Sequence, residues 1–443
     1  MGAWFRGGAL TMSTFAACWG GAIWTWRGTG SAPSNADLLT YLIALPLAVL
    51  AGVVLVRRLA HARPAAAAPD AIAPAVQAPA AAARPPALAL LGAAVRTRHG
   101  ATVEELDAAL ESGRVRADLD PELVDDAGYP VMSVRVPAAD AAAWRADAEP
   151  WFAAQGLSDL RFRAAHWRAL ELGSAVLDEL AAAQIGGDGP LLRIVPLAPS
   201  DWTAAQHTAA GTWLAHVAVR AGWKADKVVA SPAPAVESAA SLLSLLAGQA
   251  GSAAEPVLTI VVAFDSRIDQ ALVDRMAGDG VLLTAAHPQG LIPGEGACGL
   301  LLADPRLAPG APTLQAAGAT RTGSGSASSR VDAADLRRLA GRVLADSAVD
   351  AAAVSALVAD ADHRSNRILE AMVLAHDDLP HLDAGIDVRA TGPACGASGA
   401  VPFLAALALG RHHVLAGAGA IVCIGNADPV HLGAALVRSG EAS

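Results

Sequence analysis

Residues 38–56 form an uncharged apolar run, LLTYLIALPLAVLAGVVLV, near the start of the chain. A helix rises about 1.5 Å per residue, so this run is long enough to cross the roughly 30 Å apolar core of a bilayer. Pro46 lies within it, which a membrane helix tolerates. A buried helix of a soluble protein is the alternative, but Arg57, Arg58 and Arg63 follow directly and favour a membrane span with these arginines in the cytoplasm.

A second apolar stretch, residues 8–26, is rich in small residues and contains tryptophans that suit a membrane interface. It is a candidate for a second span, so residues 1–63 predict a membrane anchor with either one span or a hairpin. The next residues, 64–87, are almost entirely Ala and Pro. Repeated proline prevents a continuous helix, and we interpret this segment as an extended linker.

Beyond residue 87, short apolar runs alternate with helical patterns. Apolar runs without polar alternation indicate strands that are buried on both faces, and helices between them indicate an α/β fold. The predicted strands are residues 89–95, 257–264, 299–303 and 418–425. One predicted helix begins after Thr102, and two others cover residues 235–248 and 401–409.

The segment 320–330, TRTGSGSASSR, has the composition of a flexible connection. We therefore expect two halves in the body of the protein, residues 88–320 and 331–443.

Composition and charge exclude several classes of protein. Hydrophobic residues make up 53% of the chain and charged residues 17%, which is unlike a disordered protein. Four cysteines are too few for a disulfide scaffold. The net charge of −10 argues against nucleic-acid binding. Five arginines and one acid give residues 1–63 a charge of +4, so the rest of the chain carries −14.

Motifs for cofactors and metals are not found in the sequence. It contains no P-loop, and no G-x-G-x-x-G follows a predicted strand, so we expect no nucleotide cofactor. The segment HDDLPHLD, residues 376–383, carries potential metal ligands, but Pro380 disrupts helical spacing and we interpret it as a solvated loop. Cys298 and Cys395 lie in or beside glycine turns, and we expect buried, inert thiols.

Three segments occur in a characteristic order: residues 230–249 before a strand, residues 286–304, and residues 390–409 before another strand. Together they resemble the β-ketoacyl synthases of the thiolase-like superfamily, in layout over roughly residues 88–440. This resemblance implies a duplicated α/β/α sandwich. The positions that match the family's two glycine turns are Gly294, Glu295, Gly296, Gly396 and Gly399.

The resemblance fails at the residues that carry catalysis in this family, a cysteine nucleophile and two histidines. Ser238 lies close to the nucleophile position, and Pro393 replaces the histidine of the second turn. The other histidine position falls near His363, which is therefore the only one of the three catalytic groups that the sequence retains. A serine without an activating base is a poor nucleophile. We therefore expect that the fold was retained without its catalytic residues, and we assign no catalytic residue.

The layout also resembles the adaptors, or effector chaperones, of type VI secretion lipase effectors. It implies a protein of the bacterial inner membrane, with its soluble body in the cytoplasm and a secreted lipase as its partner. The alternatives are an acyltransferase or condensing enzyme of fatty-acid or polyketide metabolism that uses Ser238, and a membrane-anchored scaffold for other envelope enzymes. The family resemblance also predicts a homodimer that pairs through the strand at residues 257–264.

Aromatic residues are scarce, so the tryptophans of the body stand out. We expect most of them to be core anchors and some to contribute to a protein interface. His412 and His413 follow a predicted helix, where cations are favourable. The tryptophans concerned are Trp144, Trp151, Trp167, Trp202, Trp213 and Trp223.

Overall fold

The computed structural model describes residues 86–137, 141–183, 189–234, 236–252, 255–322 and 331–440. The predicted membrane anchor, nearly all of the Ala/Pro linker and most of the predicted connection between the halves lie outside these residues. Within the described part of the chain, no helix has the length and apolar character needed to span a membrane.

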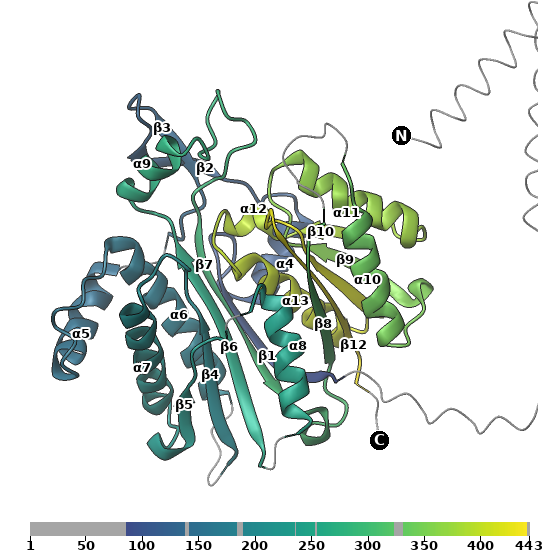
Figure 1. Ribbon diagram of the computed structural model, residues 1–443, viewed down its shortest axis with the longest axis horizontal. Coiled ribbons are helices and arrows are strands. Elements are labelled where there is room, and N and C mark those ends of the chain that lie inside the picture. The colour runs from purple at the N-terminus through teal and green to yellow at the C-terminus, as the bar shows by residue number, and fades with distance from the viewer. Residues whose placement is uncertain are drawn as a thin grey trace, which may run out of the picture. The chain divides into compact units, whose positions relative to one another are not determined.

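Ten of the twelve described strands form one sheet that consists of two matching sets of five (Figure 1). The strand orders, β1-β7-β6-β4-β5 and β8-β12-β11-β9-β10, repeat each other, and in each set the last three strands are parallel. The repeated order confirms the predicted duplication. The first set is β1 (Leu88–Arg96), β4 (Leu191–Leu197), β5 (Val228–Ala230), β6 (Val257–Ser266) and β7 (Glu295–Ala303); the second is β8 (Thr313–Thr320), β9 (Val354–Ala359), β10 (Val388–Ala390), β11 (Ala420–Gly425) and β12 (His431–Arg438).

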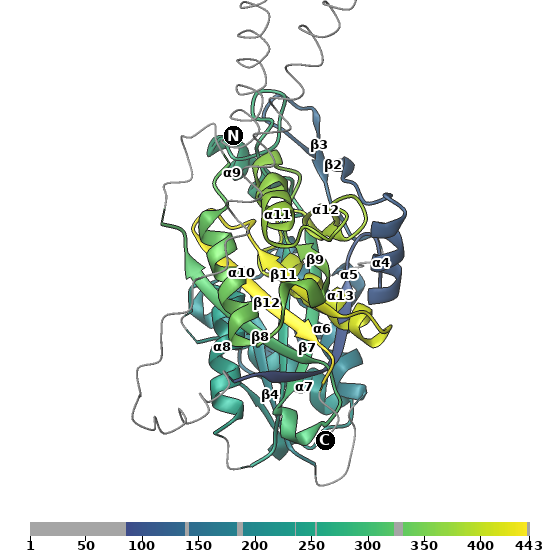
Figure 2. The ribbon, with the colours of Figure 1, turned by 90° about the vertical axis from the view of Figure 1, so that its right-hand side faces the viewer.

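Helices cover the outer face of each set and fill the space between the sets. On the first set lie α6 (Ala164–Ala182) and α7 (Ala204–Arg220). On the second set lie α10 (Ala334–Asp346) and α11 (Ser365–Asp378), toward the viewer in Figure 2. The central helices α8 (Ala239–Ala250) and α13 (Val401–Leu415) contact strands of both sets. The α13 sequence VPFLAALAL has no polar face because both of its sides are covered.

The predicted strands and helices are present, with shifted boundaries. Helix α4 (Val103–Glu111) begins after Thr102, whose hydroxyl accepts a hydrogen bond of 3.2 Å from Glu105 N. Helix α8 begins at Ala239, later than residue 235, because Ser238 is its N-cap. The predicted division after Thr320 leaves β8 in the first half, whereas β8 pairs with β12 along its full length and so belongs with the second set.

The prediction that residues 257–264 form a dimer edge is wrong. This segment is part of β6, which is hydrogen-bonded to β4 on one side and to β7 on the other. A strand paired on both sides has no free backbone groups for a second chain. The edges of the described sheet are β5 and β10. A homodimer stays a prediction, but β6 cannot mediate it by strand pairing.

A small lobe projects from the end of the first set and includes β2 (Asp118–Val124), β3 (Pro130–Ser133) and α9 (Gln270–Gly278) (Figure 1). It has a separate apolar core, which includes Leu123, Val131 and Val273. Asp120 lies within it and joins the two strands, because it accepts hydrogen bonds from Ser133 and Arg135 of 2.6 to 2.9 Å.

Five of the six described tryptophans, all but Trp223, belong to one aromatic cluster where α5 (Ala141–Ala154) packs on α6 and α7. The rings of Trp144 and Trp151 lie 5.3 and 5.1 Å from that of Trp213, measured between centroids. The indole N–H of Trp213 donates to Ser174 Oγ at 2.8 Å. Buried indoles need such a partner. The prediction that most of these residues anchor the core is confirmed: Trp167, Trp202 and Trp213 are buried, and Trp144, Trp151 and Trp223 are half-buried against the same cluster.

Candidate functional site

A cavity of about 780 Å³ lies at the carboxyl ends of parallel strands from both sets. Leu197 ends β4, Asp265 lies at the end of β6, and Asp360 directly follows β9. The starts of the two central helices, at Ser238 and Gly399, complete its wall. Ligands of α/β proteins bind at this edge of the sheet, because the chain turns away into helices there and leaves a crevice.

The two predicted glycine turns meet beside this cavity. A Cβ on Gly294 would lie 2.1 Å from the carbonyl oxygen of Cys395, so this position requires glycine. Gly396 and Gly399 both have φ of +59°, which favours glycine. Pro293 and Ala397 form a β-bridge between the two turns. The two motifs, far apart in the sequence, therefore form one packed unit.

Glu295, in the first of these turns, is fully buried and holds three segments together. Arg168 of α6 donates to both carboxylate oxygens, at 2.8 and 2.5 Å. Ser266 Oγ donates at 2.8 Å, and the backbone N–H of Val136 donates at 2.8 Å. The carboxylate is thus used for structure, and it is absent from the lining of the cavity.

Ser238 lines the cavity, but its hydroxyl caps α8. Its Oγ accepts a hydrogen bond of 3.2 Å from Ser241 N and lies 3.0 Å from Ser241 Oγ. A Cβ on Gly318 of β8 would lie 2.8 Å from the Ser238 oxygen, so the strand passes close to it. Among the described residues, the hydrogen-bond partners of this hydroxyl are both groups of Ser241. Neither of these two partners is a group that acts as a general base.

The other two predicted positions lie outside the cavity lining. His363 is half-buried, and its Nε2 is buried with no hydrogen-bond partner among the described residues. Pro393 is in the first turn of α12 (Gly392–Cys395) and lines a separate cavity with Leu110 and Arg389. The structure does not bring Ser238, His363 and Pro393 to one cavity.

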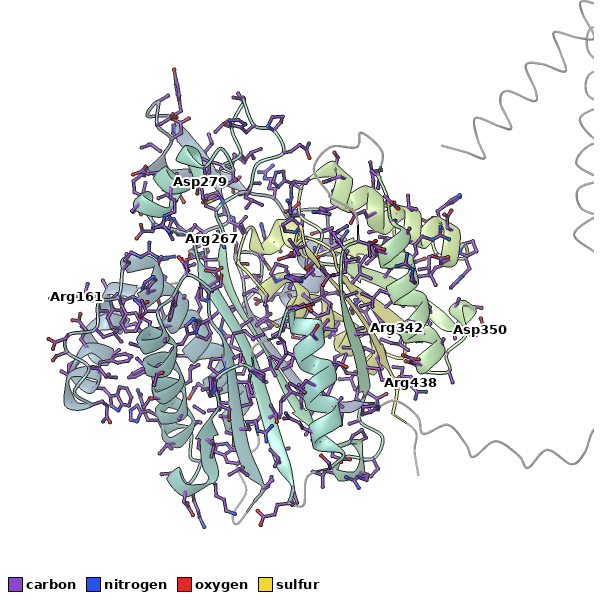
Figure 3. All side chains as sticks on the ribbon, viewed as in Figure 1. Arg161, Arg267, Asp279, Arg342, Asp350 and Arg438 are labelled. Atoms are coloured by element: carbon purple, nitrogen blue, oxygen red, sulfur yellow. The ribbon has the colours of Figure 1, made fainter. Side chains whose placement is uncertain are left out.

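The cavity instead contains two buried carboxyl groups that the sequence analysis missed. Asp265 is 4% exposed, and no described residue donates a hydrogen bond to its Oδ2. Arg267 Nε lies 3.7 Å from this oxygen. Burial raises the pKa of Asp265 to about 7, against the opposing effect of Arg267. Figure 3 shows Arg267 just beyond the end of β6, between the sheet and the lobe that contains α9.

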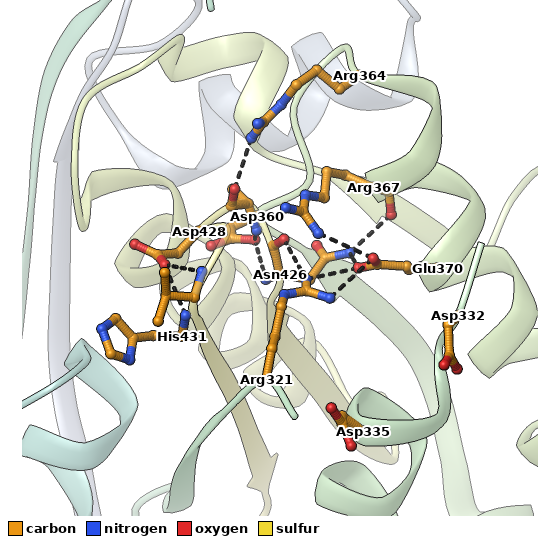
Figure 4. A network of polar contacts seen from close by, with 12 residues as sticks. Arg321, Asp332, Asp335, Asp360, Arg364, Arg367, Glu370, Asn426, Asp428 and His431 are labelled. Atoms are coloured by element: carbon orange, nitrogen blue, oxygen red, sulfur yellow. Dashed lines mark hydrogen bonds and ion pairs between the residues drawn. The ribbon is translucent and has the colours of Figure 1, made fainter. Parts of the chain in front are cut away.

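Asp360 Oδ1 accepts hydrogen bonds from the backbone N–H groups of Asn426 and Ala427, at 2.6 and 2.8 Å (Figure 4). Burial nevertheless raises the pKa of Asp360 to about 6. Asp265 lies at the end of a buried apolar run, VLTIVVAF, and Asp360 directly follows another, VSALVA. An acid at this position in two strands of a parallel sheet is the sequence signal that could have identified them.

A buried ion-pair network fixes the Asn426 loop (Figure 4). Glu370 accepts hydrogen bonds from Arg321 at 3.0 and 2.9 Å, from Arg367 at 3.0 Å and from Asn426 Nδ2 at 3.0 Å. Arg364 pairs with Asp362 and donates to the carbonyl of Ala427 at 2.7 Å. The loop that binds Asp360 is therefore held rigidly, which fixes the carboxyl group at the cavity wall.

The three described cysteines are buried, as predicted for Cys298 and Cys395. Burial raises the pKa of all three thiols, that of Cys395 to about 12. Thiols in such surroundings are poor nucleophiles. None of the three lines the cavity that contains Ser238.

The prediction of a solvated loop at residues 376–383 is only partly correct. Helix α11 continues through Asp378, and Arg337 pairs with Asp377 at 2.8 Å and with Asp378 at 2.7 Å. His381 Nε2 lies 2.7 Å from the carbonyl oxygen of Val354. Among the described residues, no group of three potential ligands is arranged to hold a metal ion.

His412 and His413 lie in the last turn of α13, as predicted, and face acidic residues of α4. His413 Nε2 is 2.9 Å from Asp107 Oδ1, and Arg389 contacts the same oxygen. Although burial opposes ionisation, the hydrogen bond from His413 and the charges nearby hold the pKa of Asp107 below its usual value.

No protein-family model matches the chain, and no curated protein matches it in sequence. Solved structures do match the geometry described above. The ketosynthase from module 6 of the bacillaene synthase of Bacillus subtilis 168 superposes with a TM-score of 0.55 at 11% identity, over 80% of this chain and 72% of that one. The chain has a thiolase-like ketosynthase fold.

Two further ketosynthase structures agree. A β-ketoacyl synthase from Burkholderia phymatum STM815 gives a TM-score of 0.52 at 13% identity, over 80% of this chain and 99% of that one. The ishigamide ketosynthase/chain length factor gives 0.53 at 16% identity, over 80% and 99%. At such identities the likeness establishes the fold and not the activity.

Proposed function

We propose that this protein uses the ketosynthase fold for binding and does not catalyse condensation through a cysteine thioester. One observation carries the proposal. The cavity at the carboxyl ends of the strands is lined by Ser238, Asp265 and Asp360, and none of its described lining residues is a cysteine. Ser238 is engaged as a helix cap, and Pro393, in place of a histidine, has no ionisable group.

In its specific form, the proposal is an adaptor that recruits a lipase effector to a type VI secretion system. The apolar run at residues 38–56, either alone or together with residues 8–26, would anchor it in the bacterial inner membrane. The arginines that follow would keep the body in the cytoplasm. The layout that the sequence shares with such adaptors supports this form.

Co-purification tests the adaptor. The full-length protein, solubilised in detergent, is used as bait for a lipase effector of the same bacterium. We expect stoichiometric capture that survives washing and depends on the body. If the lipase is not enriched above a bait consisting of residues 1–63 alone, the adaptor proposal is wrong.

The second candidate is an acyltransferase or condensing enzyme, and the observation in its favour is that Ser238 lies on the cavity wall at the start of α8. Incubation of the full-length protein with a radiolabelled acyl thioester separates the two candidates. The binding proposal predicts no covalent adduct. An adduct that disappears in Ser238→Ala but persists in Ser244→Ala, an exposed serine of the same helix, would establish the enzyme instead.

A further inference from the structure

A second cavity, of about 670 Å³, adjoins the one described above. The two share four lining residues: Arg267, Asp360, Gly399 and Asp428. These residues therefore form a common wall between two spaces at the carboxyl ends of the strands. Asp428 is held in this wall because its Oδ1 accepts hydrogen bonds from the backbone of Val430 and His431, at 2.7 and 2.8 Å (Figure 4).

Several buried polar atoms that line one or both cavities lack hydrogen-bond partners within the described residues. They include Asp265 Oδ2, Arg267 Nε and Ser398 Oγ, and Ser398 is 1% exposed. A buried polar group without a hydrogen bond is costly, so each such group in a native protein calls for a missing partner. Asp265 is buried, lines the larger cavity and has one carboxylate oxygen, Oδ2, that lacks a hydrogen bond among the described residues.

Acidic groups predominate over basic ones in the larger cavity. Its only permanent cation among the described lining residues is Arg267, which already lies 3.7 Å from Asp265. The acidic lining residues are Glu237, Asp265, Asp360 and Asp428, and the remaining titratable ones are His207 and His431. Such a lining repels a carboxylate and attracts a hydrogen-bond-donating cation.

Apolar residues line much of the rest of the cavity. They include Leu197, Val236, Phe264, Phe403 and Leu432. A ligand that fits this lining combines an apolar body with one polar end.

We propose that this cavity binds an amino or guanidino group at the end of an apolar chain, with Asp265 and Asp360 as the groups that receive the cation. The inference rests on the proposed binding function and specifies its ligand. The group can come from a free alkylamine or from a lysine or arginine side chain of a partner polypeptide. The three to five donor hydrogens on such a group can satisfy Asp265 Oδ2, which lacks a hydrogen bond among the described residues.

The start of α13 does not favour an anionic ligand instead. Helix amino termini attract anions in general. Here the place is already taken by the protein's own carboxyl group, because a Cβ on Gly399 would lie 3.3 Å from Asp265 Oδ2. The start of α8 is likewise capped by Ser238.

Binding of a cation should be linked to proton release. Asp265 faces Arg267 from the same strand end and Asp201 from the loop before α7, and its pKa is about 7. Asp360 faces Asp362 and Arg367, and its pKa is about 6. A bound cation stabilises the ionised carboxylates, so its affinity rises as pH increases from 6 to 8, about tenfold for one coupled group of pKa 7.

Titration calorimetry of the full-length protein in detergent tests this with three probes of equal length: n-hexylamine, 1-hexanol and hexanoate. We expect hexylamine to bind at least tenfold more tightly than either of the others, and more tightly at pH 8 than at pH 6. Asp265→Asn and Asp360→Asn should each weaken hexylamine about tenfold, whereas Asp147→Asn, an exposed residue of α5, should not. Partition of the probe into detergent micelles is the same for wild type and variants, so the difference between them reports binding to the cavity.

Preference for hexanoate, or equal binding of hexylamine by wild type and both cavity variants, would overturn the inference. A competition experiment shows whether the amino group belongs to a polypeptide or to a free alkylamine. If a polypeptide is the ligand, a short peptide with one central lysine should displace hexylamine. The same peptide with norleucine in place of the lysine should not. The two proposals fail separately. Loss of amine selectivity without an acyl adduct rejects the ligand class and leaves the binding function standing.

Discussion

Asp265 is the residue whose environment differs most from what its sequence position suggests. It is the ninth residue of a ten-residue strand in which the preceding side chains are apolar apart from one threonine, so it enters the interior with them and not the solvent. A carboxyl group placed there loses its hydration, and one partner at 3.7 Å does not replace it. Natural proteins retain such destabilising groups mainly where function requires them.

We therefore expect the substitution Asp265→Asn to increase the free energy of unfolding by an amount that depends on pH. The folded pKa of about 7 lies above that of the unfolded chain, so the unfolded state loses its proton first. Wild-type stability should fall as pH rises from about 4 to 7, by on the order of 3 kcal/mol. Asp265→Asn removes this loss. Urea unfolding should show that the advantage of the variant over wild type is about 3 kcal/mol larger at pH 8 than at pH 4.5; a constant difference at both pH values would contradict the assignment.

Asp120 predicts the opposite dependence. Burial opposes its ionisation, but hydrogen bonds from Arg135 and Ser133 outweigh burial and lower its pKa to about 2. The stabilisation is fully present above about pH 4 and is lost as pH falls toward 2, which amounts to about 2 kcal/mol. Asp120→Asn should lower the free energy of unfolding by about this amount at pH 7, while Asp126→Asn, an exposed neighbour, should have little effect. Equal effects of the two variants would show that the ion pair does not contribute.

At the scale of elements, the sequence predicted the strands and the two glycine turns because these depend on local patterns. Apolar runs such as VLTIVVAF indicate buried strands wherever they occur. What the sequence could not provide is which strands become neighbours. The segment at residues 257–264 looks the same as an edge strand or as an interior one, and its pairing with both β4 and β7 is decided by contacts far along the chain.

The candidate site was predictable to the same extent. Ser238 was singled out by its nearness to the family's nucleophile position, and the structure has it as the N-cap of α8; Gly294 and Gly396 were singled out as parts of two glycine turns, and the structure packs these against each other. His363 and Pro393 were assigned by their order in the sequence, which does not determine the direction of a side chain. Asp265 and Asp360 went unnoticed because the resemblance directed attention to cysteine and histidine.

Because the two glycine turns are in close contact, we expect one added methyl group at Gly294 to lower the free energy of unfolding strongly. Gly294→Ala places a Cβ 2.1 Å from the carbonyl oxygen of Cys395, so backbone must move. We expect a loss of about 3 kcal/mol or more in unfolding free energy. Gly248→Ala is the matched control: it lies in α8 with open space around it, and it should stabilise by about 0.5–1 kcal/mol. Thermal unfolding of the two variants checks this, and a mild effect at Gly294 would mean that the turns can separate.

At the scale of the whole molecule, the halves share one core and should not unfold separately. The core between the two sets of strands includes residues of both, such as Leu243 in α8 and Leu404 in α13. All tryptophans of the described residues lie in the half of the chain that contains the first set of strands, whereas the helices that give the circular dichroism signal lie in both halves. Fluorescence and far-ultraviolet circular dichroism should therefore report the same unfolding midpoint. A separate dichroism transition with unchanged fluorescence would show that the second set unfolds alone.

The pairing of β1 bears on how the chain is made. β1 is the first strand of the described body to leave the ribosome, yet Ala89 pairs with Ala303 and with Thr313. Until those residues are synthesised, its backbone groups and its apolar side chains have no native partner. A nascent chain in this condition is open to non-native pairing.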